Sequence, residues 1–72
     1  KNKNGWNYRM ISHGKGKTKH FAIHEVYYKN NKPKSVSEDG CGPFGLTKEE
    51  LIADLGMMVD AIIKPVLKYE DF

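Results

Sequence analysis

The residues Gly16, Lys17 and Thr18 stand in the order found at the end of a phosphate-binding loop. In such a loop, backbone N–H groups and the lysine hold phosphate oxygens, and the full pattern is G-x-x-x-x-G-K-[ST] before a helix. This sequence has Ile11 where the pattern requires its first glycine. A strand-like segment, rather than a helix, follows Thr18. We therefore interpret the three residues as part of a turn.

Two histidines have a spacing that a zinc site could use. His20 and His24 are four residues apart, which on a helix would direct both rings to one metal ion. On a strand the same spacing separates them by about 13 Å, too far for one ion. His13 and Cys41 add ligand types without a paired motif. We predict no metal and no cofactor, with His13 and His20 on the surface and His24 on an open sheet face.

The single cysteine is a weak candidate nucleophile. Cys41 lies between Gly40 and Gly42, six residues before Thr47, where we expect a helix to begin. A reactive thiolate needs a neighbouring base, cation or helix start to lower its pKa. No such group adjoins Cys41 in the sequence, and no pair of carboxylates has spacing for acid–base chemistry. We therefore predict that the chain is not an enzyme.

Charge is divided unevenly along the chain. Residues 1–34 carry nine lysines and arginines against one acid, a balance of +8, and residues 35–72 carry three lysines against eight acids, a balance of −5. Together they give the net +3. A basic half of this kind attracts anions, either nucleic-acid phosphates or an acidic protein.

Two sets of side chains are candidates for binding. The first is basic, clusters around a predicted hairpin, and would contact an anionic partner or nucleic acid: Arg9, Lys15, Lys17, Lys19 and His20. The second is aromatic and would form an interaction face on the sheet: Trp6, Tyr8, Tyr27 and Tyr28. Lysines neutralise phosphate and rings stack on bases. Strand alternation places Arg9 opposite Trp6 and Tyr8, which favours phosphate contact over base readout. The alternative is that the lysines only keep a small domain soluble.

The hairpin is predicted from residue alternation. Residues 6–11 alternate large apolar and polar side chains, and residues 21–28 are rich in aromatic and β-branched residues, so both segments are expected to be strands. Between them, residues 12–19 contain two glycines and three lysines, which is typical of a flexible turn. After a second turn ending at Pro33, a short third strand is expected around residues 34–37.

A helix is predicted over residues 48–64. Thr47 with Glu50 three residues later has the pattern of a capping box, and Pro65 ends or kinks the helix. Apolar residues repeat on one side of this helix, and we expect that side to pack on the sheet: Leu51, Leu55, Met58, Val59 and Ile62.

These elements predict an α+β fold, in which a three-stranded antiparallel sheet packs on one C-terminal helix in the order β-β-β-α. Residues 1–72 form one small domain, with a frayed N-terminus (1–5) and a C-terminal tail (65–72). The helix covers one sheet face, so side chains on the other must be solvated, covered by the tail or used for binding. A chain of 72 residues is too short for a deep cavity. Its single cysteine and lack of an apolar leader favour a cytoplasmic protein.

Four motifs resemble a group of short uncharacterised proteins of bacteria and their phages. They are W-N-Y-R at 6–9, I-H-E-V-Y-Y at 23–28, T-K-E-E-L at 47–51 and K-P-V-L at 64–67. The resemblance implies a free-standing small protein in a bacterial or phage setting, and it assigns no functional residue. The β-β-β-α order also resembles small DNA-binding domains, such as integrase arm-binding domains, that read the major groove through their sheet.

Together these observations predict a non-catalytic binding protein. One interpretation is protein–protein interaction, with another protein or a second copy, as a bacterial or phage regulator or inhibitor would use. The alternative is a nucleic-acid-binding domain that grips phosphate with the basic hairpin. No membrane partner and no small-molecule cofactor are expected.

Overall fold

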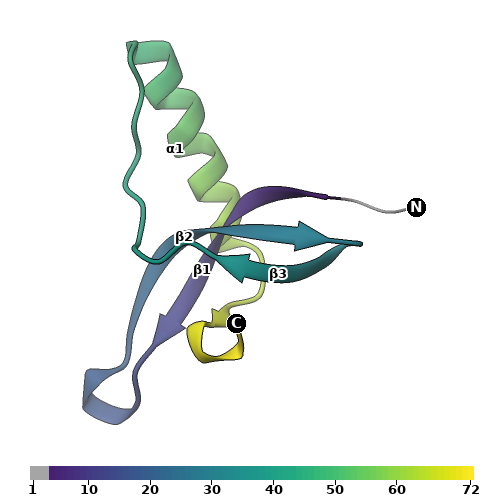
Figure 1. The fold of residues 1–72 in the computed structure, drawn as a ribbon. Helices are drawn as coiled ribbons and strands as arrows, with labels where there is room; N and C mark the ends of the chain where they lie inside the picture. The colour runs from purple at the N-terminus through teal and green to yellow at the C-terminus, as the bar shows by residue number, and fades with distance from the viewer. Residues whose placement is uncertain (1–3) are drawn as a thin grey trace.

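The computed structural model describes residues 4–72 as a curled, half-barrel sheet with one helix (Figure 1). The strands are β1 (Gly5–His13), β2 (His20–Lys29), β3 (Lys32–Val36) and β4 (Leu67–Lys68), and the helix is α1 (Lys48–Ile62). The 3-10 turns η1 (Gly16–Thr18) and η2 (Tyr69–Asp71) complete the structure. Within residues 4–72, no helix is long and apolar enough to cross a membrane.

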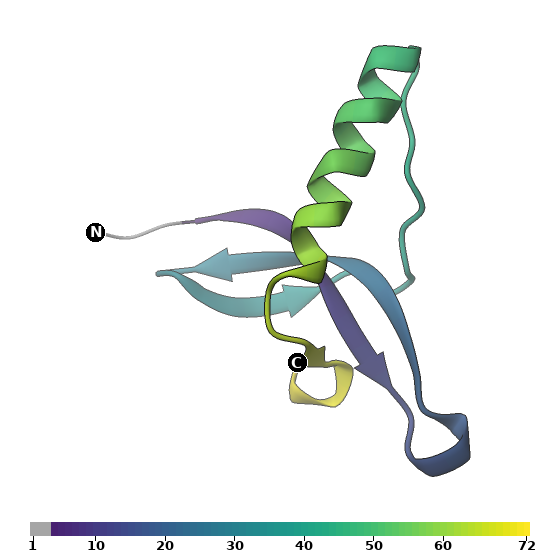
Figure 2. The ribbon, with the colours of Figure 1, turned by 180° about the vertical axis from the view of Figure 1, so that it is seen from behind.

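The predicted α+β fold is confirmed, with one addition. Strands β1, β2 and β3 form an antiparallel sheet before α1, and β4 pairs parallel to β1, which gives the strand order β3-β2-β1-β4. The addition comes from the predicted tail, which packs back on the sheet (Figure 2). Of the predicted frayed segment, residues 1–3 lie outside the described residues. Gly5 already begins β1, and the Asn4 side chain accepts a hydrogen bond from the backbone N–H of Asn30.

The β1–β2 hairpin sets which side chains share a face. Its register pairs Tyr8 with Glu25, Arg9 with His24, and His13 with His20, and paired residues point to the same side of a sheet. Two faces follow from this alternation. The face towards α1 carries Trp6, Tyr8, Met10, Phe21, Ile23 and Tyr27. The opposite face carries Asn7, Arg9, Ile11, His13, His24, Val26 and Tyr28.

Both faces of the sheet are buried near β1. On one face, Tyr8 forms a small core with Met58 and Ala61 of α1. On the other, Ile11 and Val26 are fully buried. The C-terminal tail lies over this second face, since Arg9 donates a hydrogen bond to the Pro65 carbonyl (2.7 Å). The chain therefore builds two thin cores, one under the end of α1 and one under the tail.

Helix α1 begins as predicted and ends two residues earlier. The Thr47 side chain accepts a hydrogen bond from the Glu50 backbone N–H (3.1 Å). The reciprocal bond of a capping box is displaced by one residue, because the Glu50 carboxylate accepts from Leu46 rather than from Thr47. The last helical residue is Ile62, before Pro65.

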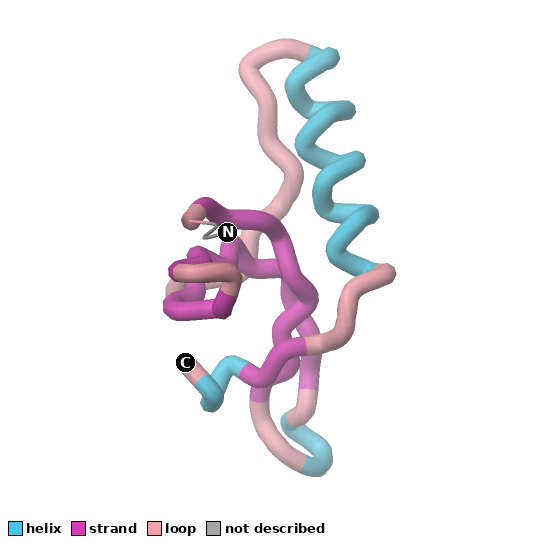
Figure 3. The backbone as a smooth tube through the Cα atoms, turned by 90° about the vertical axis from the view of Figure 1, so that its right-hand side faces the viewer, coloured by secondary structure: helices cyan, strands magenta, loops and turns pink. Residues whose placement is uncertain are grey.

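The predicted packing of α1 is wrong in one important respect. The helix rises away from the sheet (Figure 3), and it meets Tyr8 of β1 through one side only, with Asp54, Met58 and Ala61. Met58 is buried as predicted, but the other four residues of the expected packing side are exposed, including Leu55 at 50% and Val59 at 54%. The helix meets the sheet along one edge of its apolar side instead of its centre.

The two-core arrangement predicts that Ile11 is a large contributor to stability. Replacing it by alanine (Ile11→Ala) leaves a cavity under the tail and should lower the free energy of unfolding by about 2–5 kcal/mol. Leu46→Ala removes a side chain of the loop before α1 that is 84% exposed and should change it by less than about 0.5 kcal/mol. Urea unfolding followed by circular dichroism measures both. Equal effects of the two substitutions would contradict the buried position of Ile11.

Candidate functional site

The most exposed apolar surface of the described chain runs along α1. We call it the apolar stripe, and its members are Leu51, Ile52, Leu55, Val59, Ile62 and Ile63, which follows the last helical residue. At 100° per residue these six positions span about 120° of the helix circumference. All six side chains are at least 41% exposed. A contiguous apolar surface of this kind marks interaction sites on small proteins.

A polar contact explains why the stripe faces away from the sheet. Asp54 lies on the side of α1 that meets β1, where the Tyr8 hydroxyl donates a hydrogen bond to its carboxylate (2.7 Å). The second carboxylate oxygen accepts from the Phe44 backbone N–H (2.9 Å). The bond to Asp54, together with burial, raises the pKa of the Tyr8 phenol well above its usual range. A carboxylate held in this position turns the apolar side of the helix outwards.

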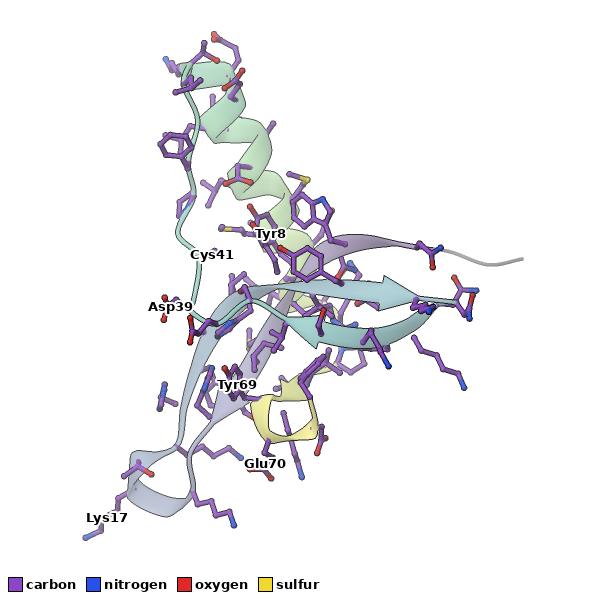
Figure 4. The ribbon with its side chains drawn as sticks, viewed as in Figure 1. Tyr8, Lys17, Asp39, Cys41, Tyr69 and Glu70 are labelled. Carbon is purple, nitrogen blue, oxygen red and sulfur yellow. The ribbon has the colours of Figure 1, made fainter. Side chains whose placement is uncertain are left out.

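An apolar groove of about 590 Å³ lies beside the stripe. One wall of the groove is α1, a second is formed by β1 and β2, and the third is the connection before α1. The lining includes Met10, Phe21, Cys41, Leu55 and Met58. Figure 4 shows Cys41 on the connection that rises from the sheet towards the start of the helix. The stripe and the groove therefore form one continuous apolar surface.

The connection before α1 is held in place at both ends. At its start, the Cys41 backbone N–H donates to the Ile23 carbonyl (2.7 Å), which extends the edge of β2. At its end, Gly45 lies against the first turn of α1, where an added Cβ would sit 2.3 Å from the Leu51 nitrogen. Only glycine allows this approach. The outer wall of the groove is thus fixed by backbone contacts.

The four predicted interaction aromatics do not form one platform. Trp6 is 48% exposed and packs edge-on against the Tyr8 ring, with centroids 5.2 Å apart. Tyr8 itself is buried under α1. Tyr27 lies on the same face as Trp6, and its hydroxyl donates to Glu25, which raises the pKa of the phenol. Tyr28 points to the opposite face. Trp6 and Tyr27 are the exposed pair of this set.

Of the predicted basic contacts, four lie together and one does not. Lys15, Lys17, Lys19 and His20 are exposed at the tip of the hairpin, and Lys17 points away from the body of the molecule (Figure 4). Arg9 is buried at 9% exposure. Its guanidinium donates hydrogen bonds to the Tyr28 hydroxyl and to the Pro65 carbonyl. Arg9 therefore holds the C-terminal tail against the sheet.

The hairpin tip is an ordered turn. Thr18 donates a hydrogen bond to the Lys15 carbonyl (2.8 Å) and accepts one from the Lys15 backbone N–H (3.2 Å). Gly14 and Gly16 have φ values of 74° and 57°, which glycine adopts without strain. The fragment Gly16-Lys17-Thr18 is the turn η1, as the sequence predicts. Its lysines are presented on a defined backbone.

A histidine cluster is the feature that the sequence reasoning missed. His13 lies between His20 and His24. Its ring stacks on that of His20, with the ring centroids 5.0 Å apart, and its Nε2 atom is 2.9 Å from Nε2 of His24. Tyr69 of η2 stacks on His13 at 4.7 Å. His24 is only 1% exposed, whereas we predicted it on an open face. The pairing of β1 with β2 and the return of the tail create this cluster.

The hydrogen bonds of the cluster indicate which ring nitrogens of His13 and His24 carry a proton. His24 Nδ1 lies 2.9 Å from the Ser37 carbonyl, which can only accept, so Nδ1 carries the proton. In the neutral ring His24 Nε2 is then an acceptor, and His13 Nε2 donates to it. The Ser37 hydroxyl lies 3.3 Å from His24 Nδ1, but it donates to the Asp39 carbonyl and accepts from the Glu25 N–H. The Ser37 hydroxyl therefore links β2 to the segment after β3.

Three of the four candidate metal ligands of the sequence, His13, His20 and His24, lie together, but their arrangement is not that of a metal site. Among residues 4–72, no three His, Cys, Asp or Glu side chains come together in an arrangement that could hold a metal ion. The stacked rings of His13 and His20 are nearly parallel, at 9°, so their nitrogens do not point to one position. Cys41 is a free, half-buried thiol.

Comparison of the chain with protein-family models, with curated proteins and with solved structures gave no match. What the chain binds must therefore be inferred from its own surface.

The histidine cluster predicts that stability falls in mild acid. Burial lowers the pKa of His13 below 6.5, and the neighbouring His24 and His20 lower it further. Below about pH 6.5 the unfolded chain therefore takes up a proton that the folded chain resists, so stability is lost as the pH falls through the folded pKa. Urea unfolding at about pH 7.5 and about pH 5 measures the loss. His13→Asn should remove much of it and His20→Asn less. The same pH dependence in His13→Asn as in the parent would contradict this origin.

Proposed function

We propose that the chain is a non-catalytic binding protein that acts by protein–protein interaction through the apolar stripe. The observation that carries the proposal is the outward orientation of α1, which leaves six large apolar side chains at least 41% exposed. The partner surface that fits them is an apolar helix with basic residues along its border. The polar border of α1 supplies the matching acids, Glu49 and Asp60.

The size of the exposed surface supports the proposal. The chain exposes 5582 Å², whereas a compact monomer of its mass, 8.2 kDa, exposes about 4500 Å². Its radius of gyration is 13.0 Å, against about 11 Å for a compact domain of this length. Both the exposed side of α1 and the projecting hairpin tip contribute to this surplus (Figure 1). Covering the side of α1 would complete a core that the single chain leaves half built.

A small regulator or inhibitor is the kind of protein that uses such a surface. Its task is to occupy a partner's surface, and a rigid helix with a fixed apolar groove beside it suits that task. The histidine cluster and the fastened tail lie on the other face of the sheet and hold the scaffold in shape. In this proposal Cys41 and His24 have no catalytic role.

Site-specific photocrosslinking tests the proposal. A benzophenone side chain is placed at Val59 in the stripe and, as the matched control, at the exposed Ala53 on the side of the helix away from the stripe. In its native host, the Val59 probe should form a covalent adduct with a protein partner, identified by mass spectrometry of the linked peptide. The Ala53 probe should form little adduct. Equal labelling by the two probes, or no adduct from Val59, would overturn the proposal.

Nucleic-acid binding by the hairpin tip is the second candidate function. It is favoured by the position of Lys15, Lys17 and Lys19, which are exposed at the end of the molecule farthest from the acidic start of α1 (Figures 1 and 4). The tip contributes charge without an adjoining ring platform, because Trp6 lies at the opposite end of β1. Phosphate contact without base readout is the mode that this arrangement supports.

Removing the three lysines together tests this second candidate. The triple variant Lys15→Ala, Lys17→Ala, Lys19→Ala should weaken DNA binding equally for all sequences. The slope of log affinity against log salt should decrease in magnitude by about 0.9 for each phosphate that the variant no longer neutralises.

The matched control for this test removes the same charge from the turn at the other end of β2, as Lys29→Ala, Lys32→Ala, Lys34→Ala. It should retain the affinity of the parent. Parental affinity of the tip variant at low salt would exclude the tip as a nucleic-acid contact.

A further inference from the structure

We propose that the outer edge of β1 at Trp6–Tyr8 is a second protein-binding site, where an extended segment of another protein adds a strand to the sheet. This site lies apart from the apolar stripe and does not depend on it. Three observations carry the proposal: unpaired backbone groups along the edge, a hollow beside them that fits one side chain, and the contrast with the edge strand on the other side of the sheet.

The backbone of β1 directs the N–H and C=O groups of Trp6 and Tyr8 away from β2. The Glu25 carbonyl accepts a hydrogen bond from the Ser37 N–H, and the Glu25 N–H donates to the Ser37 hydroxyl, so both backbone groups of Glu25 point away from β1. In an antiparallel pair, two residues directly opposite each other share this orientation. Tyr8, which lies opposite Glu25, therefore points its groups away from β2. So does Trp6, two residues earlier.

These four backbone groups have no hydrogen-bond partner among residues 4–72. Strand β4 lies on the same side of β1, but it pairs only with Ile11 and Ser12, and no backbone bond from a loop reaches Trp6 or Tyr8 in the described chain. Figure 1 shows the first half of β1 at the margin of the sheet, with no strand beyond it. An added strand would supply the partners that such groups require.

A hollow beside this edge has the size of one side chain. It has a volume of about 130 Å³, and its lining includes Trp6 and Tyr8 of β1 together with Met57, Asp60 and Lys64 from the end of α1. A cavity of about 150 Å³ can hold benzene. A strand added at the edge places every second side chain on the face towards α1, where the hollow receives one of them.

The hollow lies on the side of α1 away from the apolar stripe. At 100° per residue, Met57 is about 180° from the centre of the stripe. Trp6 and Met57 are 48% and 47% exposed, so the hollow offers an apolar contact of its own. A segment bound at the edge of β1 would leave the stripe uncovered.

The other edge of the sheet carries residues that oppose such pairing. Its outer strand is β3, which contains Lys32, Pro33 and Lys34, and whose register with β2 shifts along its length. Lysine, proline and irregular register are features by which edge strands avoid pairing with other chains. Trp6–Tyr8 contains neither lysine nor proline, and the β1–β2 register is continuous there. The sheet is therefore protected at one edge and open at the other.

The size of the hollow favours a segment of another protein over a second copy of this chain. In a two-fold antiparallel pair that joins the same four groups of each copy, Trp6 of the second copy lies opposite Tyr8. An indole ring is larger than benzene and exceeds the hollow. The occupant that fits is an extended segment with an aliphatic side chain at that position.

Nuclear magnetic resonance of the backbone amides with a synthetic strand peptide tests the proposal. The probe is a short peptide that alternates valine and threonine, with a lysine at each end for solubility. It should shift the amide signals of Trp6 and Tyr8 until they saturate, and it should slow hydrogen exchange of the Tyr8 amide by about tenfold or more. The Lys34 amide, on the protected edge, should not change.

Two control peptides test whether backbone hydrogen bonds hold the probe. One carries N-methyl groups on every valine nitrogen, and the other carries them on every threonine nitrogen. Because a strand directs alternate N–H groups to the same edge, one of these peptides should lose affinity and the other should retain it. Equal affinities of the two methylated peptides would overturn the proposal.

Two variants of the protein provide the reciprocal test. Trp6→Ala and Trp6→Pro both remove the indole ring, but only proline removes the N–H that faces the peptide. Because this N–H points away from β2, proline breaks no hydrogen bond of the hairpin. The proline variant should bind the probe more weakly than the alanine variant by about threefold to tenfold. Equal binding by the two variants would contradict the proposed contact.

The remaining outcomes also decide the proposal. Absence of any shift at Trp6 and Tyr8 on addition of the peptide would overturn it. Protection of the Tyr8 amide that grows with protein concentration, without peptide, would also overturn it, because a second copy would then occupy the edge. Either result leaves the function of the apolar stripe to the Val59 crosslinking probe, which reports on a different surface.

Discussion

The hydrogen bond between Tyr8 and Asp54 fixes the orientation of α1, and the rest of the surface depends on it. A carboxylate at a helix–sheet contact is tolerated only where its oxygens find donors, since an unsatisfied buried polar group costs about 1–3 kcal/mol. Asp54 finds them in the Tyr8 hydroxyl and in the Phe44 backbone N–H. One side chain thus joins the sheet, the helix and the connection. Because it occupies the inner side of α1, the apolar residues are turned outwards.

The opposite face of the sheet is completed by the tail, and this limits where binding can occur. Arg9 fastens Pro65, β4 pairs with β1, and Tyr69 covers the ring of His13. With this face closed over Ile11 and Val26, no large apolar surface of the second core remains for a partner within residues 4–72. The stripe on α1 is therefore the surface left over when the single chain has satisfied both faces of its sheet.

Local patterns in the sequence were sufficient to predict the elements but not how they meet. Alternation indicated the two long strands, and Thr47 with Pro65 indicated the limits of the helix. A period of 3.6 residues identifies the apolar side of a helix, yet it does not say whether that side meets the sheet or a partner. The polar contact of Asp54 decides this, and it joins residues 46 positions apart. The histidine cluster was missed for the same reason, because His13 and His24 meet only across the hairpin.

In the proposed association, apolar area and charge would have different effects. Apolar burial supplies most of the affinity of a protein interface, whereas complementary charge speeds encounter and selects orientation. In this chain the acids lie mainly on α1 and its flanks, and the basic residues lie mainly on the strands. The acidic helix that carries the stripe therefore favours a partner whose apolar surface is bordered by basic residues.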